Sequence, residues 1–516
     1  MNHSAMNMFS RTVLAILLSA MLLGLPASGA VQAAKLTAPS NTITVNDTSP
    51  GTGGPGCKLR DAIIAANTDG GAGGCSAGSG ADVIELAKGA TYTLDSVDNG
   101  INGLPAITTE ITINGNGATI ERSSAGGTPA FRFFLLNSGA NLTLNNLTLS
   151  NGRTETNSDG GAIRVSVSGS VLNLNNSTLI GNTATSSSSP FNAFGGAIAV
   201  KSGATANVTN STISGNSAYS GGGGIGNQGT LSIFGSTITG NTADMTGVDP
   251  TDGNGGGVSQ RSGTTTVRNT IIAGNADDST TTEHPDVSGA FTSGGRNLIG
   301  KSDGSTGFGG TDQVGTIAAP LDPLLSALAN NGGPTQTHAL DTGSPAIDAI
   351  PTGSLRSSAA QPANCTHDSL DLANSSFDQR GVYRADGVNT GAACDIGAFE
   401  YGATPTAVTI ATFSSQTAWG SGPQLTWETA DESGLSGFHI WRGSTDAAET
   451  RLTDELIGAA GGLTGNAYTW QDAVSFGWGQ REYYWLEAVA ADGSSNFTGP
   501  VEVVGIGRLF LPMAAR

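Results

Sequence analysis

The hydrophobic and polar positions between Leu142 and Asn275 recur five times in the same order. The segments that share the pattern are Leu142–Gly152, Leu172–Asn182, Ala206–Asn216, Leu231–Asn241 and Thr265–Asn275. One aliphatic column contains Leu144, Leu174, Val208, Ile233 and Val267, and a second contains Leu149, Leu179, Ile213, Ile238 and Ile272. A polar column between them contains Asn146, Asn176, Asn210, Gly235 and Asn269, and a closing column contains Gly152, Asn182, Asn216, Asn241 and Asn275. Self-similarity with this period predicts a solenoid.

A glycine signature follows the first four segments. It reads GGAI, GGAI, GGGI and GGGV, at Gly160–Ile163, Gly195–Ile198, Gly222–Ile225 and Gly255–Val258. The units combine short β-branched runs with Gly and Asn and lack the 3.6-residue apolar period of helical repeats. Strands that stack about 4.8 Å apart place equivalent residues in ladders, with aliphatic columns inside and Asn columns hydrogen-bonded along the axis. The pattern predicts a right-handed parallel β-helix, because a disordered linker would not keep the aliphatic columns in phase.

The chain before the repeats predicts a cap and the first coils. Asn41–Thr48 is predicted as an opening strand, and Cys57–Asn67 as a short helix with one apolar stripe. An open solenoid end exposes its core and an unpaired strand edge, so this amphipathic helix is the predicted cap. The irregular first coils are predicted to contain strands at Val83–Leu86, Thr91–Leu94, Ile111–Ile113 and Ala118–Ile120.

A change in composition marks the C-terminal part of the chain. All six tryptophans lie between Trp419 and Trp485. Short aromatic-rich strands are predicted at Leu425–Glu428, Phe438–Arg442, Ala467–Trp470 and Tyr483–Ala490. This spacing is typical of a small two-sheet β-sandwich. We expect the tryptophans to form its core rather than a carbohydrate-stacking platform.

The N-terminus and the charge indicate the compartment. Arg11 precedes an apolar run, Val13–Leu25, which suits a secretory signal peptide that is cleaved after Ala30 or Ala33. No later segment is long and apolar enough to predict a membrane span. The chain has 516 residues, of which 77 are glycines. Its formal net charge of −19 argues against nucleic acid or an anionic membrane as the main partner. The expected location is secreted, extracellular or at the cell surface.

Four cysteines in a secreted chain predict two disulfides. Three pairings are possible. Pairing Cys57 with Cys75 and Cys365 with Cys394 closes the two shortest loops and keeps each bond within one region.

Three regions of the chain carry a family resemblance. CKLRDAIIAAN at Cys57–Asn67, with the flanking strands, resembles the N-terminal CSLREA-type region of secreted bacterial β-helix proteins, from which Lys58 and Asp61 depart mildly. Asp322–Asp348 and Asp378–Gly402 resemble the choice-of-anchor Q region that follows such β-helices, and Cys365 and Cys394 stand where that family has cysteines. Leu425–Arg442 looks like bacterial fibronectin type III-like modules. The resemblance implies secretion and surface display.

Candidate chemistry is sparse along the repeats. A polysaccharide lyase needs a base beside Ca²⁺-binding carboxylates, and a glycoside hydrolase needs a carboxylate pair. The best acidic cluster is a loop with Asp277, Asp278, Glu283, His284 and Asp286, for which a solvated loop is the simpler interpretation. Asp159 and Asp252 each precede a GG signature, at different offsets, and Arg164 is a candidate surface partner for Asp159. The five histidines show no zinc-binding spacing. The sequence therefore predicts no catalytic, cofactor or metal residues.

These features define the expected organisation. The predicted parts are a signal peptide (1–33), a cap with the first coils (41–120), β-helix repeats (121–300), C-terminal coils with the anchor-like region (301–402), a sandwich (405–504) and a tail (505–516). The expected function is a structural or adhesive scaffold that binds glycans, matrix or cell-surface components. The alternative is a polysaccharide lyase or glycoside hydrolase built on the β-helix.

Overall fold

The computed structural model of the chain describes most of the regions predicted to fold. The described residues are 41–155, 158–166, 168–186, 193–244, 254–279, 283–350, 378–382, 384, 393–402, 410–417, 422–429, 432, 435–443, 448–460, 465–474, 476–477, 479–490 and 495–505. The predicted signal peptide, Asp252, Cys365 and residues 506–516 of the predicted tail lie outside them. No helix in the described part of the chain is long and apolar enough to cross a membrane.

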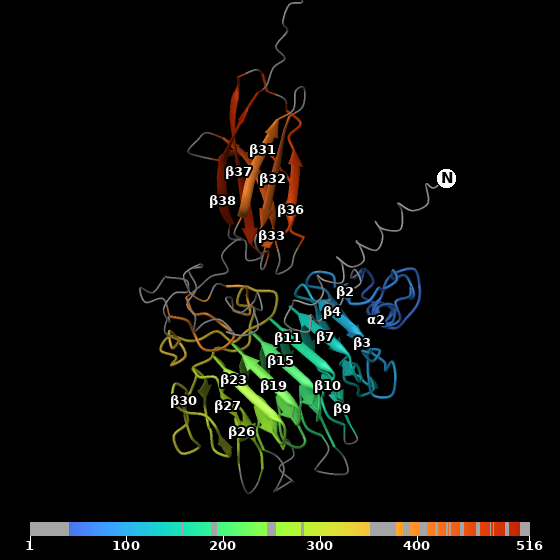
Figure 1. Cartoon of the computed structure of the whole chain (residues 1–516), viewed down its shortest axis with the longest axis vertical. Coiled ribbons are helices and arrows are strands. Elements are labelled where there is room, and N and C mark those ends of the chain that lie inside the picture. Colours follow the sequence, from blue (N-terminus) through green and yellow to red (C-terminus); the bar gives the residue numbers. More distant parts are fainter. Residues whose placement is uncertain are drawn as a thin grey trace, which may run out of the picture. The chain divides into compact units, whose positions relative to one another are not determined.

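The repeat region forms a parallel β-helix, as predicted (Figure 1). Within the described residues its strands belong to four parallel sheets, named here sheets 1 to 4. In stacking order, sheet 1 contains β1 (Thr42–Thr44), β2 (Asp82–Glu85), β4 (Glu110–Asn114), β7 (Asn141–Asn145), β11 (Val171–Asn175), β15 (Thr205–Thr209), β19 (Thr230–Phe234), β23 (Thr264–Arg268) and β27 (Thr292–Ser293).

The other three sheets complete each coil. Sheet 2 contains β6 (Phe134–Leu136), β10 (Ile163–Val165), β14 (Ile198–Val200), β18 (Ile225–Asn227), β22 (Val258–Gln260), β26 (Val287–Ala290) and β29 (Ser305–Thr306). Sheet 3 contains β3 (Thr91–Leu94), β5 (Thr119–Arg122), β8 (Thr148–Ser150), β12 (Thr178–Ile180), β16 (Thr212–Ser214), β20 (Thr237–Thr239), β24 (Ile271–Ile272), β28 (Leu298–Ile299) and β30 (Gln313–Val314). Sheet 4 contains β9 (Arg153–Thr154), β13 (Thr183–Ala184), β17 (Ser217–Ala218), β21 (Thr242–Ala243) and β25 (Ala276–Asp277).

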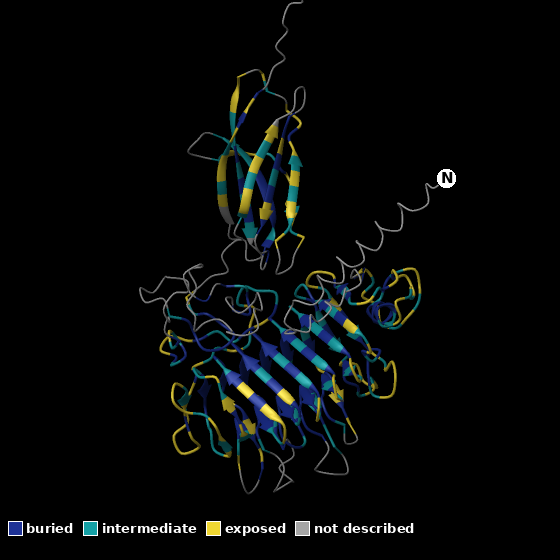
Figure 2. Ribbon diagram, viewed as in Figure 1, coloured by how far each residue is buried: buried dark blue, intermediate teal, exposed yellow. Residues whose placement is uncertain are grey.

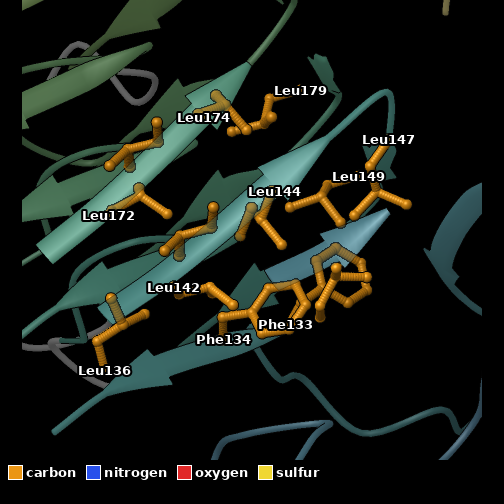
Figure 3. Close-up of a cluster of buried hydrophobic side chains, with 14 of the residues drawn as sticks. Phe133, Phe134, Leu136, Leu142, Leu144, Leu147, Leu149, Leu172, Leu174 and Leu179 are labelled. Atoms are coloured by element: carbon orange, nitrogen blue, oxygen red, sulfur yellow. The ribbon is translucent and has the colours of Figure 1, made fainter. Parts of the chain in front are cut away.

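The strand register confirms both predicted aliphatic columns. In sheet 1, Leu144 pairs with Leu174, and the column continues through Val208 and Ile233 to Val267. In sheet 3, Leu149 and Leu179 begin the second column, which runs through the equivalent isoleucines. These side chains are buried and face the interior of the coil, where Figure 3 shows the leucines of successive strands stacked beside Phe133 and Phe134. Burial of these columns supplies the main stabilisation of the solenoid.

Turns between the sheets explain the asparagine and glycine positions. The polar column between β7 and β8 and its equivalents in later coils adopt a left-handed conformation, with φ of 45–56° at Asn146, Asn176, Asn210, Gly235 and Asn269. Asn and Gly are the residues that tolerate this conformation best. The first glycine of each GG signature also has positive φ, for example 71° at Gly195, where a Cβ atom would lie 2.2 Å from the Ile198 carbonyl oxygen. The repeat therefore uses both residue types to turn the chain.

The predicted cap helix is present as α2 (Leu59–Thr68). Its apolar stripe, including Leu59, Ala62 and Ile63, is buried in the same core as β1 and β2. The disulfide Cys57–Cys75 joins the start of the helix to the loop that follows it.

Two charged residues of this helix, Arg60 and Asp61, are also buried. The Arg60 guanidinium donates to the Gly103 carbonyl, and the Asp61 carboxylate accepts the Gly53 amide. The helix is thus fixed to the first coils by packing, hydrogen bonds and a covalent link.

The aromatic-rich part forms two antiparallel sheets that fit a small sandwich. One sheet contains β31 (Ile410–Thr417), β32 (Pro423–Thr429) and β36 (Ala467–Gln471). The other contains β33 (Leu435–Gly443), β34 (Ala448–Arg451), β35 (Ile457–Gly458), β37 (Arg481–Ala490) and β38 (Ser495–Val504). Trp427 is buried between them, with its ring centroid 5.4 Å from that of Tyr468 and 5.3 Å from that of Phe438. At Trp427 the prediction of a core role is confirmed.

Candidate functional site

The acidic loop of the sequence analysis does not bring its carboxylates together. Asp277 and Asp286 are buried, whereas Asp278 and Glu283 are exposed. The Asp277 carboxylate closes its own turn, since it accepts hydrogen bonds from the backbone amides of Ser279 (3.1 Å) and His284 (2.8 Å). Burial raises the pKa of Asp277, and these hydrogen bonds oppose the rise. Among the residues that the structure describes, no three His, Cys, Asp or Glu side chains are placed to hold a metal ion.

Asp286 instead ends a buried ladder of asparagines. The closing column of the repeat, Asn182, Asn216, Asn241 and Asn275, lines up along the axis, and each side-chain amide donates to the Oδ1 of the next at 2.9 Å. Asn275 donates in the same way to Asp286 Oδ1, at 2.9 Å. Burial raises the pKa of Asp286 to about 6, while hydrogen bonds from Asn275 and the proximity of Lys301 oppose the rise. This carboxylate is a structural acceptor.

A second buried ladder ends in the same way. It runs through the hydroxyls of Ser177, Ser211, Ser236 and Thr270, each of which accepts a backbone amide from the preceding coil. Asn297 continues this ladder, and it donates its backbone and side-chain N–H groups to Asp312 Oδ1 at 3.0 Å each. Two ladders at different turns of the coil therefore end on aspartates. This regularity was not predicted from the sequence because Asp286 and Asp312 stand outside the five aligned segments.

Asp159 has a different partner from the one expected. Its Oδ2 accepts a hydrogen bond from the Lys201 ammonium at 2.9 Å, and its Oδ1 accepts the Phe194 amide at 3.4 Å. The Lys201 ammonium also lies 4.5 Å from the centre of the Phe194 ring. The prediction that Asp159 pairs with Arg164 was wrong, because the Asp159 carboxylate binds the Lys201 ammonium of the next coil instead. The other candidate in this position, Asp252, lies outside the described residues.

The outer face of sheet 3 is covered by the chain that follows the repeats. We call this segment the strap; its described residues are 322–350, 378–382, 384 and 393–402. Gln379 is buried and connects three threonines: its amide donates to Thr178 and Thr335, and its Oε1 accepts from Thr212 at 2.6 Å. The strap also has a small core of its own, which includes Leu340, Ile350 and Phe399 together with Ile271 of the solenoid. This face of the β-helix is therefore not available to a large ligand where the strap lies on it.

His338 brings a histidine of the strap beside a serine of the solenoid. Its Nε2 lies 2.9 Å from Ser214 Oγ, and its Nδ1 lies 2.7 Å from the Ser326 carbonyl, to which it donates. Burial lowers the pKa of His338, which favours the neutral imidazole, and its Nε2 then accepts a hydrogen bond from the Ser214 hydroxyl. For Ser214 and His338 to catalyse acyl transfer, free N–H donors would also have to be placed to stabilise an oxyanion. The nearby amide of Gly215 is already used by the sheet. We interpret this contact as a docking contact of the strap.

The strap also contains a buried cluster of charges. The Arg380 guanidinium binds Asp378 with an N–O distance of 2.7 Å and lies 3.7 Å from the Phe399 ring centre. Burial, followed by the charge of Asp395, raises the pKa of Glu400 to about 10, and Arg384 opposes the rise. Burial also raises the pKa of Asp395 to about 6. The pKa values of these two carboxyl groups differ, as those of an acid–base pair need to, but both groups are buried within the strap and accept hydrogen bonds from its backbone amides.

Cys394 lies in this part of the strap and is disulfide-bonded. Its predicted partner, Cys365, lies outside the described residues, so that pairing stays a prediction.

The outer face of sheet 1 is open by comparison. Its central column runs through Thr112, Thr143, Asn173, Asn207, Ser232 and Thr266, all partly or fully exposed (Figure 2). Side-chain amides connect neighbouring strands along this face: Asn207 donates to Asn173 at 2.9 Å, and Asn175 donates to Asn145 at 3.0 Å. From β7 to β19 the outward positions carry no ionisable group. Apart from the apolar Val171 and Phe234, these outward positions form a surface of amides and hydroxyls that is repeated about every 4.8 Å.

Comparisons with protein-family models, with curated proteins and with solved structures find no match for this chain. The fold and the surface chemistry are therefore the basis for assigning a function.

Proposed function

We propose that the protein is a secreted or cell-surface scaffold whose sheet 1 face binds neutral glycan chains. The observation that carries this proposal is the uncharged amide and hydroxyl array on β7, β11, β15 and β19. Sugar hydroxyls both donate and accept hydrogen bonds, as do amides and hydroxyls of the protein. A repeated polymer matches a repeated surface, because each further contact acts at high effective concentration.

Several features support a scaffold role. The buried carboxylates that an enzyme would need accept hydrogen bonds inside the ladders and the strap. The disulfide Cys57–Cys75 fits an oxidising compartment, as does the apolar run Val13–Leu25 at the N-terminus. The resemblance to CSLREA-type, choice-of-anchor Q and fibronectin type III-like regions implies surface display. The alternative of a polysaccharide lyase or glycoside hydrolase receives no comparable support from Asp277 or Asp286.

Binding to immobilised glycans, matrix proteins and whole cells tests the proposal. Thr143→Glu with Asn207→Glu introduces two charges into the centre of the face, where desolvation of a carboxylate opposes binding of a neutral chain. We expect affinity to fall about tenfold or more. Thr306→Glu, on the exposed strand β29 of sheet 2, is the matched control and should bind like the unmodified protein. Equal binding by both variants, or no binding to any neutral glycan, contradicts the proposal.

A further inference from the structure

Basic residues concentrate in one part of an otherwise acidic chain. Between residues 121 and 201 the basic residues are Arg122, Arg132, Arg153, Arg164 and Lys201, and the acidic residues are Glu121, Glu155 and Asp159. The whole chain has a net charge of −19, so this excess of positive charge is local. It falls on the coils that contain β5 to β14.

Most of these charged groups have partners. Arg153 binds Glu155 at 2.9 Å, and Lys201 binds Asp159 at 2.9 Å. Arg122 donates to the carbonyls of Thr128 and Pro129. The two remaining arginines are Arg132 and Arg164.

Those two arginines have buried N–H groups without acceptors. Arg132 is only 1% exposed, and its Nε and Nη1 have no hydrogen-bond partner. Arg164 is partly exposed, and its Nε is likewise buried without a partner. A buried charged donor without an acceptor destabilises a protein, so a ligand that supplies oxygen atoms would be favoured there.

The fold places the two arginines on neighbouring coils. Arg132 lies two residues before the start of β6, and Arg164 is the central residue of β10, which pairs in parallel with β6 through Ile163 and Phe134. Burial, followed by the charge of Arg164, lowers the pKa of Arg132 to about 10, and the charge of Asp159 opposes both effects. The Arg132 guanidinium therefore remains charged at neutral pH.

We propose that Arg132 and Arg164 form a binding site for an oxyanion, namely a carboxylate or sulfate group. A guanidinium presents planar, paired N–H donors that match the oxygen atoms of these groups. The ligand is either a free anion or an acidic group on a polysaccharide. Arg132 lies just before β6 and Arg164 lies on β10, both strands of sheet 2, so the site does not depend on the glycan-binding face of sheet 1.

Calorimetric titration of the full protein at low salt tests the site, with inorganic sulfate, oligogalacturonate and a sulfated oligosaccharide as probes. We expect Arg164→Gln to weaken binding by about tenfold or more, because it removes a charge-assisted hydrogen bond. Arg153→Gln is the matched control: it removes an equal charge from an arginine already paired with Glu155, and affinity should change less than about twofold.

Arg132→Met gives a second readout that separates ligand binding from folding. The buried charge is removed, so the melting temperature without anion should not fall, while the rise on adding sulfate should disappear. Binding of sulfate alone identifies a free anion as the ligand, and tighter binding of an oligosaccharide identifies a polysaccharide. The proposal is overturned if no probe binds, or if Arg164→Gln binds as tightly as the unmodified protein. Measuring the affinity of Arg164→Gln for neutral glycans tests the proposed function of sheet 1 separately, because this variant leaves the sheet 1 face unchanged.

Discussion

Asn275 donates its backbone N–H and its side-chain amide to the same atom, Oδ1 of Asp286, at 2.9 Å each. The same double contact joins Asn182 to Asn216, and then each asparagine to the next. Every amide side chain in the ladder both accepts and donates, so the series of hydrogen bonds has a direction. Only its last member needs to be a pure acceptor, which an ionised carboxylate is.

Replacing an asparagine inside this ladder should destabilise the solenoid strongly. In Asn241→Ala, the donors of Asn216 lose their acceptor, and the carbonyls of Ile213 and Thr239 lose their donor. Each unsatisfied buried group costs about 1–3 kcal/mol, so we expect a loss of roughly 3–5 kcal/mol in the free energy of unfolding, measured by urea denaturation.

Asn173→Ala is the matched control for this experiment. Asn173 belongs to a similar ladder on the outer face of sheet 1, where water can replace the lost hydrogen bonds. We expect a change below about 1 kcal/mol. Equal losses in the two variants would show that burial of the ladder does not determine its contribution.

Asp286 should make stability depend on pH. Burial raises its pKa from 3.8 to about 6, so the folded protein binds the proton more tightly than the unfolded chain. Its contribution to the free energy of unfolding is therefore present below about pH 4 and is lost as the pH rises through 6. Asp286→Asn keeps the acceptor oxygen and cannot ionise. Between pH 4 and 7 this variant should gain on the order of 2–3 kcal/mol relative to the unmodified protein. Parallel pH profiles in urea denaturation would contradict this assignment.

The glycine signature should be intolerant of a side chain for steric reasons. Gly195 and Gly215 both have positive φ, of 71° and 65°, but only Gly195 has a carbonyl oxygen in the space of a Cβ atom. Gly215→Ala should lose about 1–2 kcal/mol from the backbone conformation alone. Gly195→Ala adds the clash and should lose at least about 2 kcal/mol more, or prevent folding. Similar thermal stability of the two variants would mean that the backbone relaxes around the new methyl group.

The disulfide should stabilise the cap locally. Cys57 and Cys75 are separated by 18 residues, a loop for which chain entropy predicts about 3 kcal/mol. The Cys57→Ala, Cys75→Ala variant should therefore show faster amide hydrogen exchange in α2, while amides of β19 serve as the internal reference. Unchanged exchange in α2 would show that packing and the Arg60 and Asp61 contacts are sufficient to hold the helix.

The repeat made the β-helix predictable, because a period that keeps aliphatic residues in phase allows only a solenoid with those residues inside. The two asparagine columns were not distinguishable in sequence, although Asn146 turns the chain through its φ angle and Asn182 bonds along the axis. Their roles depend on where each side chain points in three dimensions.

The strap contacts were not predictable either. Gln379 meets Thr178 across 201 residues of sequence, and a periodic pattern contains no information about such a contact. Similarly, the unpartnered N–H groups of Arg132 become evident only when burial is known. The alternation of inward and outward residues along each strand was sufficient to predict which amides and hydroxyls face outward on sheet 1. That no strap covers this face could not be predicted in the same way.

The direction of the asparagine ladder has a consequence for how the length of this protein can change in evolution. Asn216 and Asn241 occupy equivalent positions 25 residues apart, and each makes the same contacts to the coil before and the coil after. A gene rearrangement that removes or duplicates one whole coil leaves every amide with a donor and an acceptor. Loss of the coil that carries Asp286 would leave the new last asparagine without an acceptor for its amide. The solenoid is therefore extensible in its middle and fixed at its C-terminal end.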